Sequence, residues 1–280
     1  MISVLSSHIK ILRPLNVFIS GLAMLVGAAI LGELHNLSVV IRTVVVVMCY
    51  TAAANVFNDF IDYEIDLINR PSRPIPSGKV NKKVALILAV ILFCIGSITC
   101  LELTQGAQVI AIIFSMPLMV YYSTHLKGMP IIGNIIIALI LGLSFLFCGE
   151  AHNNIRPMLI PMILAFGLTL VRELIKDIAD MEGDSLLGLK TFPITAGINN
   201  AVRLTIILSF IIGLASLIPF IMGTYNVWYG ILLFLGVEIP LGVVVASLII
   251  KPGISSAIRG AGLLKFSTLM GLVAIYIGTL

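Results

Sequence analysis

Charged residues are scarce in this chain of 280 residues, since Asp, Glu, Lys and Arg make up 11% of it and apolar residues 59%. Soluble domains have about 25% charged and about 45–50% apolar residues. The composition therefore argues against a soluble enzyme, a disordered protein or a nucleic-acid-binding module. The mean hydropathy of +1.14 points the same way. We expect an integral membrane protein whose surroundings are the lipid bilayer and which binds no nucleic acid.

Motifs of several enzyme classes are also missing. The four cysteines stand in apolar runs without a CxxC pair, which is typical of small buried side chains. The four histidines lie in separate segments, and the sequence has neither the P-loop pattern of nucleotide hydrolysis nor a GxSxG nucleophile motif. The sequence therefore gives no indication of thiol, histidine–metal or nucleotide chemistry.

Long apolar runs dominate the chain instead. A helix crosses the hydrocarbon core with about 20 apolar residues, and this length predicts an all-α polytopic membrane protein with nine transmembrane helices. The absence of period-2 alternation argues against a β-barrel. No polar linker separates the halves, so we expect a single domain over residues 1–280. The expected spans are residues 14–32, 38–57, 84–103, 107–123, 131–149, 157–175, 203–223, 227–250 and 258–279.

Basic residues alternate between the connections of these spans. With the N-terminus inside, 14 of the 17 Lys and Arg residues fall on the inner side. The positive-inside rule then places the N-terminus and the long loops 58–83 and 176–202 in the cytoplasm, and the C-terminus outside. We therefore expect a multi-pass protein of the plasma membrane whose acidic loops face the cytoplasm.

Nine of the 13 acidic residues fall into two short windows, 59–66 and 173–184. A shift of 118 residues superimposes the polar positions of the two windows, which have the same spacing of i, i+4, i+7 and i+11. This spacing puts four side chains on one face of a continuing helix. It predicts an internal repeat, with motifs at 55–66 and 173–184, in which two stripes face each other across a cavity. The first stripe is Asn55, Asp59, Asp62 and Asp66, and the second stripe is Glu173, Asp177, Asp180 and Asp184.

Carboxylates on one helical face repel each other and lose hydration, so a cation must compensate them. Mg²⁺ is typically held by a few carboxylates, water and phosphate oxygens. Nearby basic residues add donors for a phosphorylated ligand. The alternative is that the acids form ion pairs with these bases at the membrane surface. The basic residues are Arg70, Arg73, Lys79, Lys127, Arg172, Lys176 and Lys190.

The segment NDFIDYEID, followed by NRPSRPIPSG and a second motif DIADMEGD, resembles the UbiA superfamily of intramembrane prenyltransferases. Further matches are RPLN at Arg13, YS…LK ending at Lys127, GN at Gly133 and KTFP at Lys190. The resemblance covers nearly the whole chain. It implies nine helices around a central cavity, with a polyprenyl diphosphate held through Mg²⁺ at the two aspartate motifs.

The resemblance also implies roles for individual residues. Asn58, Asp62, Asp66, Asp180 and Asp184 would form the metal and diphosphate site, with Asp59 and Asp177 as supporting ligands or hydrogen-bond acceptors. Within the superfamily, RELIKDIADMEGD with a following GxKTxP is most similar to archaeal enzymes that join geranylgeranyl diphosphate to geranylgeranylglyceryl phosphate. An aromatic acceptor, such as 4-hydroxybenzoate, a quinone precursor or a tetrapyrrole, is the alternative. A secondary transporter is a remote alternative of another class.

Loss of diphosphate from an allylic donor leaves a carbocation, so the site must neutralise the leaving group and exclude water. We expect Arg73, Lys127 and Lys190 to bind diphosphate oxygens, with Arg70 either joining them or capping its loop. The proline-rich segment 70–78 is either a stiff lid or an ordinary loop.

Other residues fit the acceptor and the cation. Glu173 or Asp177 could take the acceptor proton, and Arg13 could bind the lipid phosphate of the acceptor. Tyr122 or its neighbour Tyr121 could stabilise the cation, or both could be interfacial tyrosines. Glu238, beside a proline in the eighth expected span, either lines the cavity or is protonated.

Overall fold

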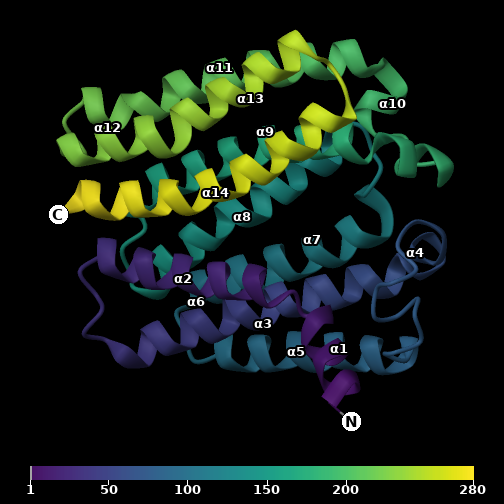
Figure 1. Ribbon diagram of the computed structural model, residues 1–280. Coiled ribbons are helices and arrows are strands. Elements are labelled where there is room, and N and C mark those ends of the chain that lie inside the picture. The colour runs from purple at the N-terminus through teal and green to yellow at the C-terminus, as the bar shows by residue number, and fades with distance from the viewer. Residues whose placement is uncertain (1) are drawn as a thin grey trace. The chain divides into compact units, whose positions relative to one another are not determined.

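A computed structural model describes residues 2–280, and the side chains of residues 2–5, 68 and 69 lie outside the described part. Every regular element within the described residues is a helix (Figure 1), which confirms the all-α expectation. Residue contacts divide the chain into two compact units. Unit 1 comprises Met1–His125 and Leu146–Arg156, and unit 2 comprises Leu126–Phe145 and Pro157–Leu280.

Unit 1 is built from helices that begin and end close to the expected boundaries. Thr104 caps the start of α6, since its side chain accepts from the backbone N–H of Ala107, and Asn81 caps the start of α5 by accepting from the backbone N–H of Lys83. Such caps satisfy backbone donors that have no partner within the helix. The elements are α1 (Ile2–Ile11), α2 (Pro14–Ile30), α3 (Leu37–Ile61), α4 (Tyr63–Asn69), α5 (Lys82–Cys100), α6 (Gln105–Gln108) and α7 (Met116–Tyr121).

Helix α3 forms the centre of unit 1, where it packs against α2 and α5. Tyr50 of α3 is buried against Phe93, and its hydroxyl is 2.8 Å from the Ser97 hydroxyl on α5. A Cβ on Gly96 would come within 2.7 Å of the Tyr50 ring. The close approach of α3 and α5 therefore depends on a glycine at this position.

Helix α8 (Ile132–Ala151) belongs to both units, with residues 132–145 in unit 2. Unit 2 otherwise consists of a long helix that carries the second stripe and of three further membrane-length stretches. Its elements are α9 (Leu159–Leu186), α10 (Phe192–Ala196), α11 (Ile198–Ile221), α12 (Val227–Leu233), α13 (Ile239–Ile250) and α14 (Ile254–Thr279).

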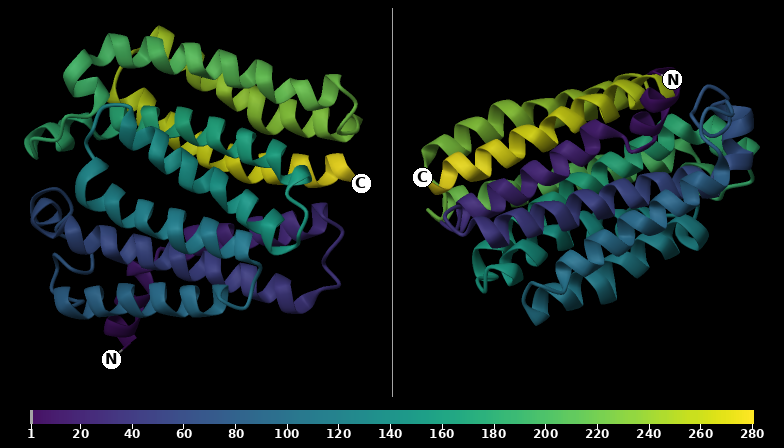
Figure 2. Two further views of the ribbon diagram at one scale, coloured as in Figure 1. Left: turned by 180° about the vertical axis from the view of Figure 1, so that it is seen from behind. Right: turned by 90° about the horizontal axis from the view of Figure 1, so that it is seen from below.

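The contacts between the helices of unit 2 form a closed ring. Helix α9 contacts α11 and α14, α11 contacts α12 and α13, and both α12 and α13 contact α14. Figure 2 shows α14 running beside α9, and α11 beside α13. The core side of α9 is made of Leu174, Ile175 and Ile178, which are at most 1% exposed. This packing fixes the rotation of α9 and therefore which of its faces carries the acidic stripe.

Eight helical stretches among the described residues are long and apolar enough to cross a membrane. The protein is therefore a multi-pass membrane protein. The remaining expected span, the first (14–32), corresponds to α2, which is apolar but has 17 residues. Helix α9 is the longest, and its 28 residues extend about 42 Å, compared with about 30 Å for the hydrocarbon core.

Three short segments have the wider π-helical turn. They are Val109–Ser115 and Tyr122–Leu126 on either side of α7, and Phe234–Glu238 between α12 and α13. Each π turn shifts the following side chains around the helix, so a period of 3.6 does not hold through these stretches. The fourth expected span consequently extends to Gln105–Leu126.

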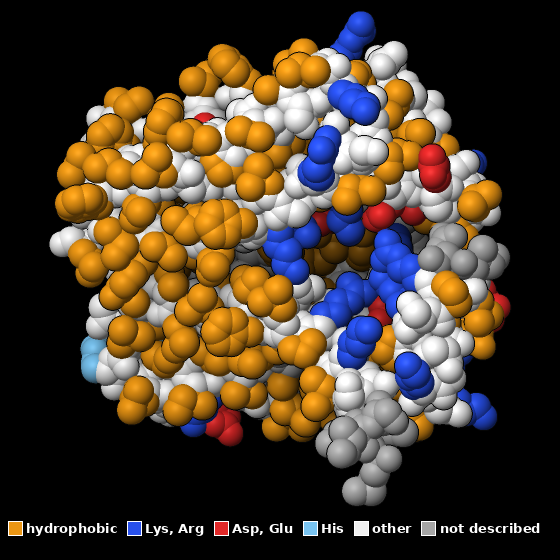
Figure 3. Space-filling view, in the orientation of Figure 1, with side chains coloured by type: hydrophobic (Ala, Val, Ile, Leu, Met, Phe, Trp, Pro, Cys, Tyr) orange, Lys and Arg blue, Asp and Glu red, His pale blue; other side chains and the backbone are white. Residues whose placement is uncertain are grey.

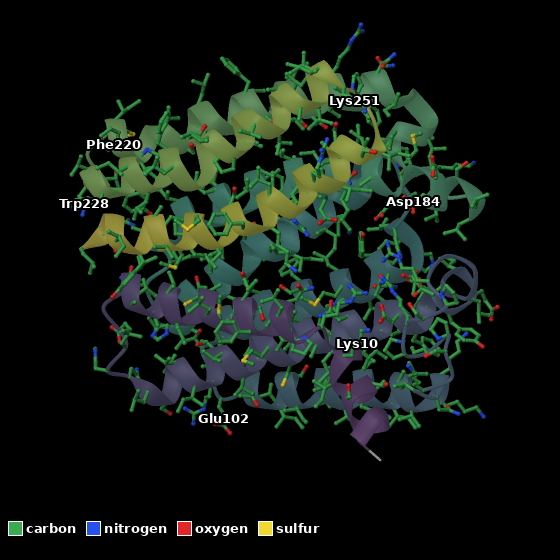
Figure 4. The ribbon with its side chains drawn as sticks, viewed as in Figure 1. Lys10, Glu102, Asp184, Phe220, Trp228 and Lys251 are labelled. Carbon is green, nitrogen blue, oxygen red and sulfur yellow. The ribbon has the colours of Figure 1, made fainter. Side chains whose placement is uncertain are left out.

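The two ends of unit 2 differ in character. Figure 3 shows apolar side chains over α12 and the C-terminal part of α14, and Lys and Arg side chains over the opposite end of α13 and α14. In Figure 4, Phe220 and Trp228 lie at one end of the unit, and Asp184 and Lys251 lie at the other. Aromatic residues at one boundary and charges at the other are typical of helices that cross a bilayer.

Candidate active site

The first stripe lies where α3 ends and α4 begins. We expected one continuing helix, but α3 ends at Ile61 and the backbone of Asp62 (φ −76°, ψ 4°) leaves the helical conformation. Two backbone hydrogen bonds bridge the break, from the Asp62 N–H to Asn58 and from the Asp66 N–H to Asp62. The side-chain register therefore survives, and Asp59, Asp62 and Asp66 are buried, each at most 5% exposed.

Two arginines compensate the buried acids of the first stripe. Arg13 Nη2 lies 2.5 Å from Asp59 Oδ1, and Arg73 Nη1 lies 3.4 Å from the same oxygen. Arg73 also donates to Asp66 Oδ2 at 2.5 Å. One ion-pair network thus joins residues that are up to 60 positions apart in the sequence, namely Arg13, Arg73, Asp59 and Asp66. Both the metal-site hypothesis and the ion-pair alternative are consistent with these contacts.

Arg13 reaches this network from a strained backbone. Its φ of 55° and ψ of 69° are left-handed, although the residue is not glycine and precedes Pro14. This conformation costs about 1–2 kcal/mol for a residue with a Cβ. Asn55 stabilises it from α3, because its side chain donates to the carbonyl of Leu12 at 3.0 Å. Asn55 therefore orders the chain before Arg13 instead of extending the carboxylate face.

Neighbouring side chains set the orientation of the Asp62 carboxylate and the pKa of the Asp66 carboxyl. Asn58 donates to Asp62 Oδ2 at 2.7 Å and so orients that carboxylate. Burial raises the pKa of the Asp66 carboxyl above its ordinary value, while the hydrogen bond and charge of Arg73 oppose this rise. A second cation at Asp66 would favour the charged form further.

The proline-rich loop, which contains Arg73, is anchored at two points. Ile75 and Val80 are buried in a cluster with Ile11 and Val56. The Val80 N–H donates to the Pro74 carbonyl at 2.9 Å. The loop therefore has its own core and holds Arg73 in place, and its predicted action as a lid stays a prediction.

The second stripe lies on the unbroken helix α9. Glu173 is 7% exposed and accepts from Arg172 Nη1 at 2.8 Å and from Lys176 Nζ at 3.0 Å. Two adjacent cations thus compensate the charge of the Glu173 carboxylate. Asp177 accepts from Asn134 Nδ2 of α8 at 2.8 Å, and Asp180 and Asp184 are half-buried further along the same face.

The two predicted diphosphate lysines of unit 2 come from adjoining segments. The Lys190 N–H donates to the carbonyl of Gly128, the residue after Lys127, at 3.1 Å. Gly128 has a φ of 113°, and a Cβ there would lie 2.9 Å from the Leu189 side chain. Glycine thus permits the contact that brings together two lysines 63 positions apart.

The residues present fit a hard divalent cation by their chemistry, since both stripes offer carboxylate oxygens beside side-chain amides. Among the described residues, however, no three His, Cys, Asp or Glu side chains already converge as a ligand set. Arg73 holds two of the acids in unit 1 instead. Tyr121 stacks on His125 with ring centroids 4.8 Å apart and is half exposed, while Tyr122 begins the neighbouring π segment.

The model of the UbiA prenyltransferase family matches residues 20–259 of this chain. The chain belongs to the UbiA prenyltransferase family. It is therefore a prenyltransferase, and the UbiA resemblance seen in the two aspartate motifs is confirmed.

Known UbiA proteins similar to this chain include archaeal lipid enzymes. The digeranylgeranylglyceryl phosphate synthase of Methanothermobacter thermautotrophicus is 38% identical over 237 residues, which are 84% of this chain and 83% of the relative. A solved structure of a digeranylgeranylglyceryl phosphate synthase in membranes matches with a TM-score of 0.80 and 29% identity, covering 100% of this chain and 99% of that one.

A more distant UbiA homologue from Archaeoglobus fulgidus, solved with DMAPP and Mg²⁺, matches with a TM-score of 0.68 and 17% identity. The match covers 96% of this chain and 99% of that one, and at this identity it shows the shared fold alone. The UbiA fold is thus common to members that differ widely in sequence.

Sequence reasoning assigned no role to Asn134 of this UbiA chain. Asn134, which holds Asp177, is 6% exposed, and its Oδ1 has no hydrogen-bond partner. Its link to Asp177 crosses 43 positions, which a pattern within one helix cannot reveal. The pairing of Glu173 with Lys176 was readable, because residues i and i+3 on a helix are neighbours.

Proposed function

We propose that this chain transfers a geranylgeranyl group from geranylgeranyl diphosphate to the free hydroxyl of geranylgeranylglyceryl phosphate, which forms an ether of archaeal membrane lipids. The observation that carries the proposal is 38% identity to a digeranylgeranylglyceryl phosphate synthase over most of both chains. In this function the whole chain, residues 1–280, acts as one catalytic domain with an internal repeat.

The aspartates of both stripes, together with the side-chain amide of Asn58, would hold Mg²⁺. The proposed set is Asn58, Asp59, Asp62, Asp66, Asp177, Asp180 and Asp184. Bound Mg²⁺ supplies positive charge that neutralises the diphosphate leaving group. Because Arg13 and Arg73 already hold Asp59, we assign that residue the weaker, supporting part within the set.

The protein's own cations would bind the rest of the diphosphate. Arg73, Lys127 and Lys190 donate to its oxygens as the allylic C–O bond breaks and the electron pair leaves with the diphosphate. Arg73 is then shared between Asp66 and the substrate, so donor binding and loop position are coupled. Tyr122, five positions before Lys127, would stabilise the allylic cation through its ring.

The acceptor oxygen then bonds to the allylic carbon and loses its proton. The candidate acceptors of this proton are Asp177 and Glu173. Glu173 is paired with two cations, whereas Asp177 accepts from the neutral Asn134 and takes the proton only if Mg²⁺ is held by the other members of the set. The reaction needs little help from a base because the electrophile is highly reactive.

Membrane placement follows from the charge pattern. Nine transmembrane helices, with α2 as the first, and a cytoplasmic N-terminus would put both stripes at the cytoplasmic side of the plasma membrane. Donor and acceptor would both enter from the bilayer.

The deciding experiment supplies purified protein with radiolabelled geranylgeranyl diphosphate, with Mg²⁺ or with EDTA. Geranylgeranylglyceryl phosphate and 4-hydroxybenzoate are offered as acceptors in parallel reactions. We expect Mg²⁺-dependent label in the doubly prenylated lipid. Label on the aromatic acid alone would mean that the acceptor is aromatic, and failure to bind geranylgeranyl diphosphate would mean that the donor is a different prenyl diphosphate.

A further inference from the structure

The second acidic motif has no amide where the first motif has one. The shift of 118 residues that superimposes the two stripes places Lys176 on Asn58. In unit 1, the Asn58 amide donates to Asp62 Oδ2 at 2.7 Å and belongs to the proposed metal set. Lys176 cannot replace this amide, because an ammonium group only donates hydrogen bonds and offers no oxygen to a cation. The set proposed so far for unit 2 therefore has carboxylates only.

Asn134 of α8 brings an amide to the second stripe from another helix. Its Nδ2 donates to Asp177 Oδ2 at 2.8 Å, in the same way that the amide of unit 1 donates to its aspartate. Helices α8 and α9 (Figure 1) pack closely, since a Cβ on Gly142 would lie 3.2 Å from the carbonyl oxygen of Met162. Each unit thus joins one asparagine amide to one aspartate of its stripe.

The hydrogen bond to Asp177 fixes the orientation of the Asn134 amide. An ionised carboxylate only accepts hydrogen bonds, so the NH₂ group faces Asp177 and the amide oxygen remains to accept from or bind another group. This oxygen, Oδ1, is buried and has no hydrogen-bond partner among the described residues, and the side chain is 6% exposed. Buried amide oxygens are nearly always paired, so an unpaired one indicates a ligand.

The cation that adjoins Asp177 on α9 is shared with other acids. Lys176 donates to Glu173 Oε2 at 3.0 Å, and its charge also acts on Asp177 and Asp180. The hydrogen bond that Asp177 itself accepts comes from a neutral amide. A further cation at Asp177 would therefore be favourable, because an opposite charge nearby stabilises an ionised carboxylate.

The start of α8, which carries Asn134, is fixed by its surroundings. The Gly128 carbonyl accepts from the Lys190 N–H at 3.1 Å and so ties the segment that carries Lys127 to the end of the second motif. Ile131 has a φ of 64°, which is unfavourable for a β-branched residue. Such strain persists only where the surrounding structure over-determines the backbone. The fold therefore holds the Asn134 amide beside the second stripe, seven positions after a lysine proposed to bind diphosphate.

We propose that Asn134 Oδ1 is an additional ligand of the Mg²⁺ that Asp177 helps to hold, so that Asn134 takes the part in unit 2 that Asn58 takes in unit 1. Amide oxygens, like carboxylates, are hard ligands that suit Mg²⁺ and Mn²⁺. The inference rests on the proposed function and deepens it. Asp177 then holds the cation and does not take the acceptor proton.

Three variants separate a metal ligand from a residue that only orients Asp177. Asn134→Leu removes the whole amide, whereas Asn134→Asp keeps an oxygen but loses the donor to Asp177. The control Asn200→Leu removes an exposed amide of α11 that donates to a backbone carbonyl outside both stripes.

The affinity of each purified protein for Mn²⁺, which prefers the same ligands as Mg²⁺, is measured without substrate from the electron paramagnetic resonance of free Mn²⁺. We expect Asn134→Leu to weaken Mn²⁺ binding about tenfold or more, since even the hydrogen-bond partners of metal ligands contribute about 10- to 100-fold. Asn134→Asp should stay within about threefold of the wild type or bind more tightly, because it retains an oxygen ligand and adds a negative charge. The control should match the wild type.

Two results would overturn the proposal. One is unchanged Mn²⁺ affinity in Asn134→Leu. The other is an equal loss in Asn134→Leu and Asn134→Asp, which would mean that Asn134 acts only through its hydrogen bond to Asp177. Melting curves in EDTA show whether each variant is folded, and Asn134→Ala replaces Asn134→Leu if the latter is not. If the wild type binds Mn²⁺ through Asn134 but forms no ether with geranylgeranylglyceryl phosphate, the proposed function fails and the ligand stands.

Discussion

Replacing Arg13 by Met should lower the free energy of unfolding by about 2 kcal/mol. Removing one partner of a fully buried ion pair costs about 3–5 kcal/mol. Two observations reduce this value here. The Arg13 side chain is 35% exposed, and Arg73 remains 3.4 Å from Asp59 to compensate part of its charge.

The backbone of Arg13 permits a sharper comparison. Arg13→Gly removes the same guanidinium but adopts a φ of 55° without steric strain. We therefore expect Arg13→Gly to lose about 1 kcal/mol less than Arg13→Met. A further variant, Asp59→Asn, removes the carboxylate charge, and the double variant Arg13→Met/Asp59→Asn closes a mutant cycle.

Unfolding in mixed micelles, followed by circular dichroism for all four variants, measures these differences. The cycle should show a coupling energy of about 1–2 kcal/mol between positions 13 and 59. Additive losses would mean that the pair contributes nothing. A larger loss for Arg13→Gly than for Arg13→Met would show that the left-handed conformation is not strained.

Three further changes test the site and its surroundings. Asp62→Ala or Asp184→Ala should abolish turnover while the circular dichroism spectrum stays native. The control Glu102→Ala, which lies outside both stripes, should remain active. A normal rate in either aspartate variant would remove that aspartate from the proposed metal site. Lys127→Ala should weaken donor binding about tenfold or more through loss of a charged hydrogen bond, and unchanged donor affinity in equilibrium binding would exclude that contact. Burial lowers the pKa of His152, whose ring nitrogens have no hydrogen-bond partner, so the stability that its neutral form contributes is lost as the pH falls from about 6.5 through the lowered pKa. The melting temperature of His152→Phe should therefore change less with pH over this range than that of the wild type. An equal change in both proteins would contradict the assignment.

The membrane spans could be predicted because the bilayer imposes one length on every crossing segment. The eighth expected span, 227–250, has the same bounds in the structure. The fourth was less accurate, since two π segments within Gln105–Leu126 break the periodicity that marks a helix. The break at Asp62 was missed because the spacing of the stripe continues across it.

The site was predictable as a set of residues but not as a set of contacts. Helical spacing alone identifies the two stripes. It does not show that Arg13 reaches Asp59 over 46 positions or that Asn134 reaches Asp177 over 43. Such contacts depend on how the helices pack. The left-handed backbone of Arg13 could not be predicted either, because nothing in the identity of the residue as arginine indicates that conformation.

The length of α9 has a consequence for how this enzyme meets its substrates. The helix is longer than the hydrocarbon core is thick, and its acids continue from Glu173, within the span, to Asp184 near its end. The acidic face of α9 thus extends from the hydrocarbon core of the bilayer into water. A lipid can be held along it without leaving its leaflet. The concentration that governs the rate is then the mole fraction of each lipid in the membrane, so diluting the substrates with inert phospholipid slows the reaction even when their bulk amounts stay the same.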